Sequence, residues 1–213
     1  MNTVHGVADL EYRADRKERR SSRRRILAVG VVAGSGMSAV SLRERFLRAG
    51  DALASPSKTQ DTRILQLVLQ LEYTQVAFYE QALRDAGLQG ELRDFAQTAL
   101  GHERQHLAAI RKALSSRAGP KPSFDFGQQT KSQDAFSRAA IKLEDLAVSA
   151  YNGQATNLTA PTLAAAATIV SVEARHAAWV RALAGEVAAP DPVDKPVTAK
   201  QAADGLHEIG LKS

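Results

Sequence analysis

Residues 103–106 read Glu-Arg-Gln-His and residues 173–176 read Glu-Ala-Arg-His, so the pattern Glu-x-x-His occurs twice, 70 residues apart. A single glutamate precedes each pair, Glu72 by 31 residues and Glu144 by 29 residues. Side chains three residues apart share one face of a helix, so the Glu and the His of each pair can reach the same metal ion. This constellation is the ligand pattern of a dinuclear metal site inside a four-helix bundle. The candidate metal ligands are therefore Glu72, Glu103, His106, Glu144, Glu173 and His176.

Each candidate glutamate falls within an apolar stripe of a predicted helix. In residues 60–86, Leu65, Val68 and Val76 recur at helical spacing on the face that carries Glu72. The other three helices show similar stripes, and that of the fourth begins at Leu163. A buried carboxylate without a partner costs several kcal/mol, and four of them would repel one another. Two divalent cations would balance the four carboxylates, and two neutral histidines would add nitrogen ligands.

The ligands belong to an internal repeat. Glu72 is followed seven residues later by Tyr79, and Glu144 is followed seven residues later by Tyr151. Each half of the chain thus supplies one glutamate and one Glu-x-x-His pair, which indicates two helical hairpins related by a pseudo-twofold. Residues 118–130 are long enough to cross from one end of such a bundle to the other. We predict an all-α, four-helix bundle with a long crossover and a short C-terminal helix.

The chain divides into four predicted parts. Residues 1–54 form a leader, 55–59 a linker, 60–186 the bundle, and 187–213 a proline-punctuated tail with a short helix. Within the bundle, Ser132 is expected to cap the third helix and Gly153 to end it. In the tail, Thr198 and Gln201 have the spacing of a capping box.

The leader has the features of an export signal. Residues 22–27, Ser-Arg-Arg-Arg-Ile-Leu, resemble the twin-arginine consensus, and a weakly apolar run interrupted by glycines follows them. We therefore expect the twin-arginine export machinery as a partner and a periplasmic or secreted location. Residues 52–54, Ala-Leu-Ala, offer a cleavage point, and retention of the leader as an anchor stays open. A disordered basic tail is the alternative interpretation.

The charge of the chain does not indicate nucleic-acid binding. The net charge is +5 and the pI about 9.6, but residues 1–50 alone carry 11 Lys or Arg and 5 Asp or Glu. The rest of the chain is close to neutral and has no basic stripe with interleaved aromatic residues. Cysteine is absent, which excludes disulfides and thiolate metal sites.

About residues 60–210 resemble the bacterial ferritin-like domain family that includes desiccation-related proteins. The resemblance rests on the segments 71–79, 102–106, 124–126, 143–151 and 172–179, which hold all six candidate ligands. It implies a ferritin-like bundle with a di-iron or related site, and it does not imply one particular reaction.

The function favoured by these patterns is chemistry at a carboxylate-bridged di-iron centre. Such a centre would use oxygen or peroxide, in iron handling or oxidative-stress protection, as a di-iron or di-manganese oxidase or ferroxidase. Iron is the expected metal, with manganese as a second candidate, because oxygen and imidazole ligands suit both. A homo-oligomer is compatible with the sequence.

Two alternatives remain at the level of the sequence. The first is a non-catalytic stress or desiccation-related bundle with a structural metal. The second is a zinc hydrolase, because residues 102–106 also spell His-Glu-x-x-His, with His102 and His106 as zinc ligands and Glu103 as the base. Against it, Val172 stands in the place of His102 in the second half, and the repeat already explains Glu103 and His106.

Overall fold

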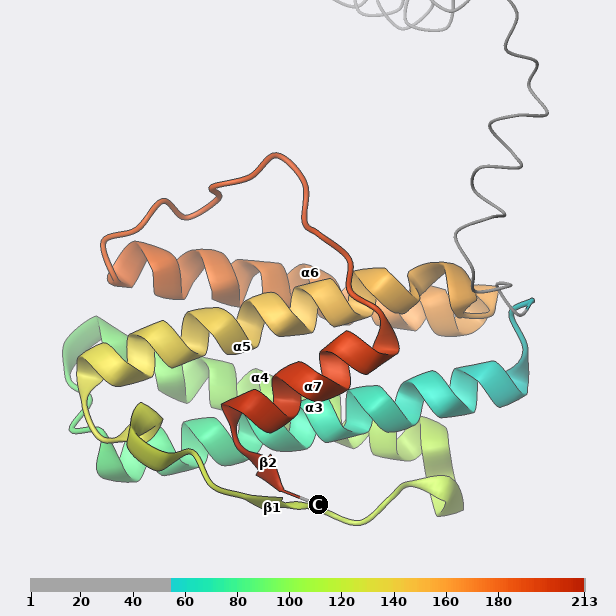
Figure 1. The fold of residues 1–213 in the computed structure, drawn as a ribbon, viewed down its shortest axis with the longest axis horizontal. Helices are drawn as coiled ribbons and strands as arrows, with labels where there is room; N and C mark the ends of the chain where they lie inside the picture. Colours follow the sequence, from blue (N-terminus) through green and yellow to red (C-terminus); the bar gives the residue numbers. More distant parts are fainter. Residues whose placement is uncertain (1–54, 213) are drawn as a thin grey trace, which may run out of the picture. The chain divides into compact units, whose positions relative to one another are not determined.

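A computed structural model describes residues 55–212, and the predicted leader, residues 1–54, lies outside the described residues. Four long helices run side by side along the same axis (Figure 1), which confirms the predicted all-α bundle. These helices are α3 (Lys58–Asp85), α4 (Gly90–Leu114), α5 (Gln133–Gln154) and α6 (Ala160–Leu183). None of the helices in residues 55–212 combines the length and the apolar character that a membrane span requires.

The bundle consists of two antiparallel hairpins, as the repeat predicted. Gly87 and Gly90 join α3 to α4 and both have positive φ angles, 63° and 53°, which glycine adopts without strain. A short 3-10 helix at Ala155–Asn157 leads from α5 to α6. Helix α3 also contacts α5, and α4 contacts α6, so the four helices enclose a common interior.

The crossover between the hairpins runs the length of the bundle (Figure 1), as its reach predicted. It contains 3-10 helices at Ser115–Arg117 and Gly127–Thr130 and the two-residue strand β1 (Ser123–Phe124). Strand β1 pairs antiparallel with β2 (Leu211–Lys212) at the C-terminal end, with Phe124 opposite Leu211. The sequence did not predict this ladder, because two residues are too few to show an alternating pattern.

The N-terminal caps of the helices agree with the sequence. Ser132 accepts a hydrogen bond from the backbone N–H of Ala135 at 3.2 Å, as predicted for the third helix. Ser57 caps α3 through the N–H of Gln60 at 3.2 Å, so this helix begins at Lys58, two residues before the predicted position.

The prediction that Gly153 ends the third helix is wrong, because α5 continues to Gln154. A Cβ atom on Gly153 would lie 1.8 Å from the carbonyl oxygen of Val197. This glycine therefore allows the C-terminal tail to pass close against α5, and it does not terminate the helix.

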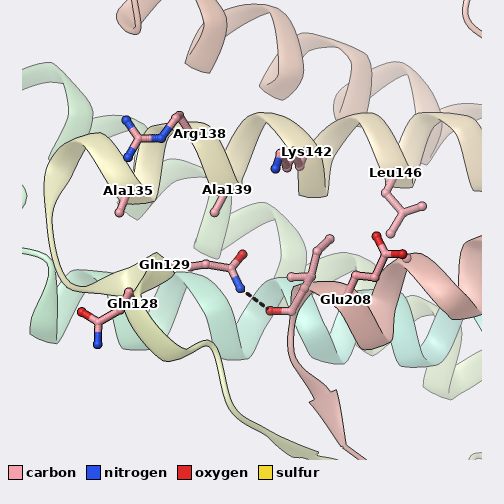
Figure 2. Close-up of a pocket in the computed structure, with 10 residues that line it drawn as sticks. Gln128, Gln129, Ala135, Arg138, Ala139, Lys142, Leu146 and Glu208 are labelled. Carbon is pink, nitrogen blue, oxygen red and sulfur yellow. Dashed lines mark hydrogen bonds between the residues drawn. The ribbon is translucent and has the colours of Figure 1, made fainter.

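The tail ends in α7 (Ala199–Ile209), which packs across α3 and α5. Its predicted capping box is present, with Thr198 accepting from the N–H of Gln201 at 3.2 Å. At its other end the side-chain amide of Gln129 donates to the carbonyl oxygen of Ile209 at 2.8 Å (Figure 2). The crossover and the tail thus hold each other against the bundle.

The core is strongest where α3, α4 and α5 meet. Phe78, Tyr79, Phe95 and Phe136 are fully buried there and contact one another as aromatic pairs. The first half of α6 is different, because its apolar residues stay largely outside this core. Leu163, predicted to open the buried stripe of the fourth helix, is 38% exposed.

Candidate metal centre

The six predicted ligands meet in the interior of the bundle. Helix α3 carries Glu72, α4 carries Glu103 and His106, α5 carries Glu144, and α6 carries Glu173 and His176. All four glutamates have no exposed surface at all. Each lies on the inward stripe of its helix, so four different elements each place one carboxylate at a common point.

The six side chains form two overlapping groups, each with ligand atoms within 4.8 Å of one another. Glu72 and His106 belong to the first group, whereas Glu144 and His176 belong to the second. Glu103 and Glu173, the glutamates of the two Glu-x-x-His pairs, belong to both groups. The cluster therefore has the pseudo-twofold symmetry that the repeat predicted.

The Nδ1 atom of each histidine faces carboxylate oxygens. That of His106 lies 2.9 Å from Glu173 Oε1, 3.0 Å from Glu103 Oε2 and 3.7 Å from Glu72 Oε2. That of His176 lies 3.0 Å from Glu103 Oε1 and 3.5 Å from Glu144 Oε2. Two nitrogen atoms and the carboxylates of four helices thus surround one small volume.

Several of these atoms lack the partner that burial demands. Within residues 55–212, Glu72 Oε2 is buried and makes no hydrogen bond. Glu103 Oε1, Glu173 Oε1 and His176 Nδ1 are also buried, and their close contacts at 2.9–3.0 Å lie only within the cluster and are not aligned as hydrogen bonds. Buried polar atoms in native proteins are nearly always paired, because an unpaired one costs about 1–3 kcal/mol. A donor set of oxygens and imidazole nitrogens that lacks partners on its inner side fits divalent cations.

Two tyrosines form hydrogen bonds to Glu72 and Glu144, the outer glutamates, which each belong to only one ligand group. Each tyrosine comes from the hairpin opposite to that of its glutamate. The hydroxyl of Tyr151 donates to Glu72 Oε1 at 2.6 Å, and the hydroxyl of Tyr79 donates to Glu144. In the sequence each tyrosine follows the glutamate of its own half by seven residues. The sequence could not reveal that each tyrosine serves the glutamate of the other half, because that pairing crosses between hairpins.

Gln75 and His102 support the remaining ligands. The amide of Gln75 donates to Glu173 Oε2 at 2.8 Å and so helps to orient that carboxylate. His102 Nδ1 lies 2.9 Å from Nε2 of His176, on the side of that ring away from the carboxylates. His102 therefore belongs to neither ligand group, whereas the zinc hydrolase alternative requires it as a metal ligand.

Burial and mutual repulsion change the acidity of the carboxyl groups. Burial raises the pKa of Glu72 well above its usual range, and the neighbouring charges of Glu173 and Glu103 raise it further. Burial also raises the pKa of Glu173, although the contact with His106 opposes the increase. The metal-free cluster therefore tends to bind protons.

The histidines of the cluster become strong bases. Burial alone would lower their pKa values, but the carboxylates of Glu103 and Glu173 around His106, and of Glu103 and Glu144 around His176, raise both to about 10. The sequence suggested four carboxylates balanced by metal ions, with neutral histidines. In the metal-free protein the two histidines are themselves cations that offset part of the negative charge.

Glu80 is a glutamate of the same helix as Glu72 that lies outside the cluster. It lies on α3 eight residues after Glu72 and forms a salt bridge with Arg104 at 2.9 Å. Its side chain is 30% exposed and belongs to neither ligand group.

Comparison with known proteins identifies the domain. The family model of the ferritin-like domain matches residues 60–186. No curated protein sequence matches the chain significantly.

Proposed function

Because the chain belongs to the ferritin-like domain family, we propose that its buried cluster binds two divalent metal ions, iron or manganese, and that the loaded protein oxidises Fe(II) with oxygen or peroxide. One observation carries the proposal: two ligand groups overlap and share Glu103 and Glu173. A single ion would need one such group, whereas two overlapping groups suit a pair of ions that share ligands.

The charge of the cluster favours the same conclusion. Four carboxylates carry four negative charges, which two divalent cations balance when the histidines are neutral. The buried oxygen Glu72 Oε2, which makes no hydrogen bond, would gain a partner by metal coordination. A bound pair of such ions would supply electron transfer to oxygen or peroxide.

The surrounding side chains orient the ligands. Tyr151 and Tyr79 each donate a hydrogen bond to one oxygen of an outer glutamate, which leaves the second oxygen for a metal ion. Gln75 holds one oxygen of Glu173 in the same way. The contact between His102 and Nε2 of His176 fixes the ring so that Nδ1 faces the carboxylates.

The proposal is tested by metal content and oxygen consumption. The purified full-length protein, loaded anaerobically with Fe(II), should bind two ions per chain and consume oxygen when air is admitted. Glu103→Gln should abolish both, because this residue serves both ligand groups. Glu80→Gln is the matched control, since Glu80 lies on the surface and should change neither.

The outcomes distinguish the alternatives. Two bound ions without oxygen or peroxide consumption would indicate a structural metal site in a stress-related protein. One tightly bound zinc ion that resists replacement by iron would refute the dinuclear proposal.

We further propose that the protein acts outside the cytoplasm after export by the twin-arginine route. The support is the Ser-Arg-Arg-Arg-Ile-Leu sequence at residues 22–27. This route transports folded chains, so metal could be inserted before export.

A further inference from the structure

A cavity of about 670 Å³ opens beside the metal centre, among α3, α4 and α6. Its volume lies within the range of about 300–1,000 Å³ that is typical of small-molecule sites. The hollow between α5 and α7 (Figure 2) is lined by Arg138, Lys142 and Glu208 and by none of the candidate ligands. The cavity beside α6 bears on the chemistry of the cluster, because His106 and Tyr151 are among the residues that line it.

This cavity extends from one end of the bundle to the metal centre. At the end it is lined by Lys58, which begins α3, and by Arg117, which follows α4. At the centre it is lined by His106, Tyr151 and Ile169. His106 and Arg117 are 11 residues apart, which corresponds to roughly 16 Å along a helix. That length is comparable to an extended acyl chain.

Between these two ends the walls are predominantly apolar. Ile64 and Val68 from α3, Ile110 from α4, and Ala165 and Ala166 from α6 form the sides. The small side chains of α6 leave space that larger residues would fill. This explains why the first half of α6 is apolar and yet does not join the packed core.

Positive charge dominates the outer end of the cavity. Lys58 and Arg117 are exposed, and within residues 55–212 neither forms a salt bridge. Asp61 is the acidic residue among the lining side chains, but its carboxylate is already occupied. It accepts hydrogen bonds from the backbone N–H of Thr159 at 2.9 Å and from the hydroxyls of Thr159 and Thr162 at 2.5 and 2.7 Å.

The inner end reaches only one half of the metal cluster. The side chain of His106 is 11% exposed and lines the cavity, whereas that of His176 is 3% exposed and lies behind His102. The two ligand groups are symmetric in composition and differ in access. A molecule in the cavity would approach the group that contains Glu72 and His106.

We propose that this cavity binds an amphipathic organic acid of the fatty-acid type, with its carboxylate at Lys58 and Arg117 and its apolar tail against the His106 side of the metal centre. The contact with a metal ion rests on the proposed function, but the binding itself does not. The ligand class follows from a predominantly apolar cavity of acyl-chain length that has the exposed side chains of Lys58 and Arg117 at its outer end.

Binding is measured with the fluorescent fatty acid cis-parinaric acid and the full-length protein, both metal-free and loaded with Zn²⁺. We expect saturable binding of one molecule per chain and displacement by oleate. Ala166→Phe should weaken binding by at least about tenfold, because the ring would fill the cavity. Ala167→Phe is the matched control, since Ala167 is exposed and does not line the cavity.

A variant on a second wall of the cavity keeps the test valid if Ala166→Phe does not fold. Ala109→Trp, on α4, should also weaken binding, and its neighbour Ala108→Trp should not, because only Ala109 lines the cavity. Equal effects of lining and non-lining variants would overturn the proposal. So would self-association of the protein that Ala166→Phe breaks, in the absence of probe binding by the monomer, because a second copy would then cover the groove.

The orientation is tested from both ends. Replacing Lys58 and Arg117 together by Ala should weaken the binding of oleate at least about tenfold. The binding of oleyl alcohol should not change, since the alcohol has no anionic head group. A fatty acid labelled with ¹³C at its terminal methyl should relax faster in the Mn²⁺-loaded than in the Zn²⁺-loaded protein. Stronger relaxation of a labelled carboxylate than of the methyl would overturn the proposed orientation.

The two proposals fail separately. A protein that binds two metal ions but no cis-parinaric acid would refute the cavity proposal and leave the dinuclear site intact. A protein that binds the probe but no metal would refute the proposed function and leave the cavity as a fatty-acid site.

Discussion

Metal loading of this protein should release protons to the solvent. In the metal-free protein His106 and His176 are surrounded by carboxylates that raise the pKa of each to about 10, so both are protonated at pH 7. A metal ion binds only the neutral imidazole, and each histidine must therefore lose one proton. Glu72 and Glu173, whose pKa values are also raised by burial, would add to the protons released.

The size of the effect follows from these pKa values. Removing a proton at pH 7 from a group with a pKa of about 10 costs about 4 kcal/mol, so the two histidines together cost about 8 kcal/mol. This cost decreases as the pH approaches 10. The overall association constant for two metal ions should therefore rise about a hundredfold per pH unit between pH 7 and 9.

The measurement is isothermal titration calorimetry with Zn²⁺, a metal without redox chemistry, in buffers of different ionisation enthalpy. The dependence of the observed heat on the buffer gives the number of protons released, which should be at least about two per chain. His106→Gln should release about one fewer. His207→Gln, which changes a histidine on α7 that belongs to neither ligand group, should behave as the wild type.

A release of fewer than one proton per chain would refute the reasoning. It would mean that the histidines are neutral before metal binds, or that they do not bind metal. Saturation with two ions but no pH dependence would point to the same conclusion.

The same protons make the stability of the metal-free protein depend on pH. The folded pKa values of the two histidines lie above the ordinary value of 6.5, so their stabilising contribution is complete below pH 6.5 and disappears as the pH rises through about 10. The raised pKa of Glu72 acts in the same direction, because it favours the folded state only while the group is protonated. The melting temperature of the metal-free protein should fall between pH 6.5 and 10, and bound Zn²⁺ should remove most of that fall. A constant melting temperature would contradict this account.

Four further outcomes are expected. His102→Ala should retain two metal ions, measured by elemental analysis, because His102 contacts Nε2 of His176, the nitrogen that faces away from the carboxylates. Complete loss of metal would favour the zinc hydrolase alternative. Tyr151→Phe should weaken metal affinity about tenfold in chelator competition, because it removes a hydrogen bond that orients a ligand carboxylate, and an unchanged affinity would contradict that role. Asp61→Ala should lower the free energy of unfolding, measured in urea, by about 2–4 kcal/mol, because the carboxylate accepts three hydrogen bonds at the start of α6. The difference between the variant and the wild type should vanish as the pH falls through the lowered pKa of Asp61. Replacing Arg23 and Arg24 together by Lys should retain the protein in the cytoplasm in a fractionation assay, and continued export would exclude the twin-arginine route.

The sequence by itself was sufficient to predict the fold class and to identify the six candidate ligands. Helical periodicity is a local property, so the position of Glu72 on an apolar stripe and the three-residue spacing within each Glu-x-x-His pair can be read without any tertiary contact. The repeat then predicted two hairpins, and the length of the crossover predicted where it must run. The caps at Ser132 and Thr198 were also predictable, because capping depends on a few adjacent residues.

Only the tertiary structure decided how these pieces meet. A stripe shows that a side chain points inwards, but not which helix lies opposite, so the bonds of Tyr79 and Tyr151 to the glutamates of the other hairpin could not be predicted. Gly153 was misinterpreted for the same reason, since the backbone that passes it comes from a distant part of the chain. The access to His106 is likewise a property of packing: two halves that repeat in sequence are covered by different neighbours, and the cavity opens where α6 presents alanines in place of larger side chains.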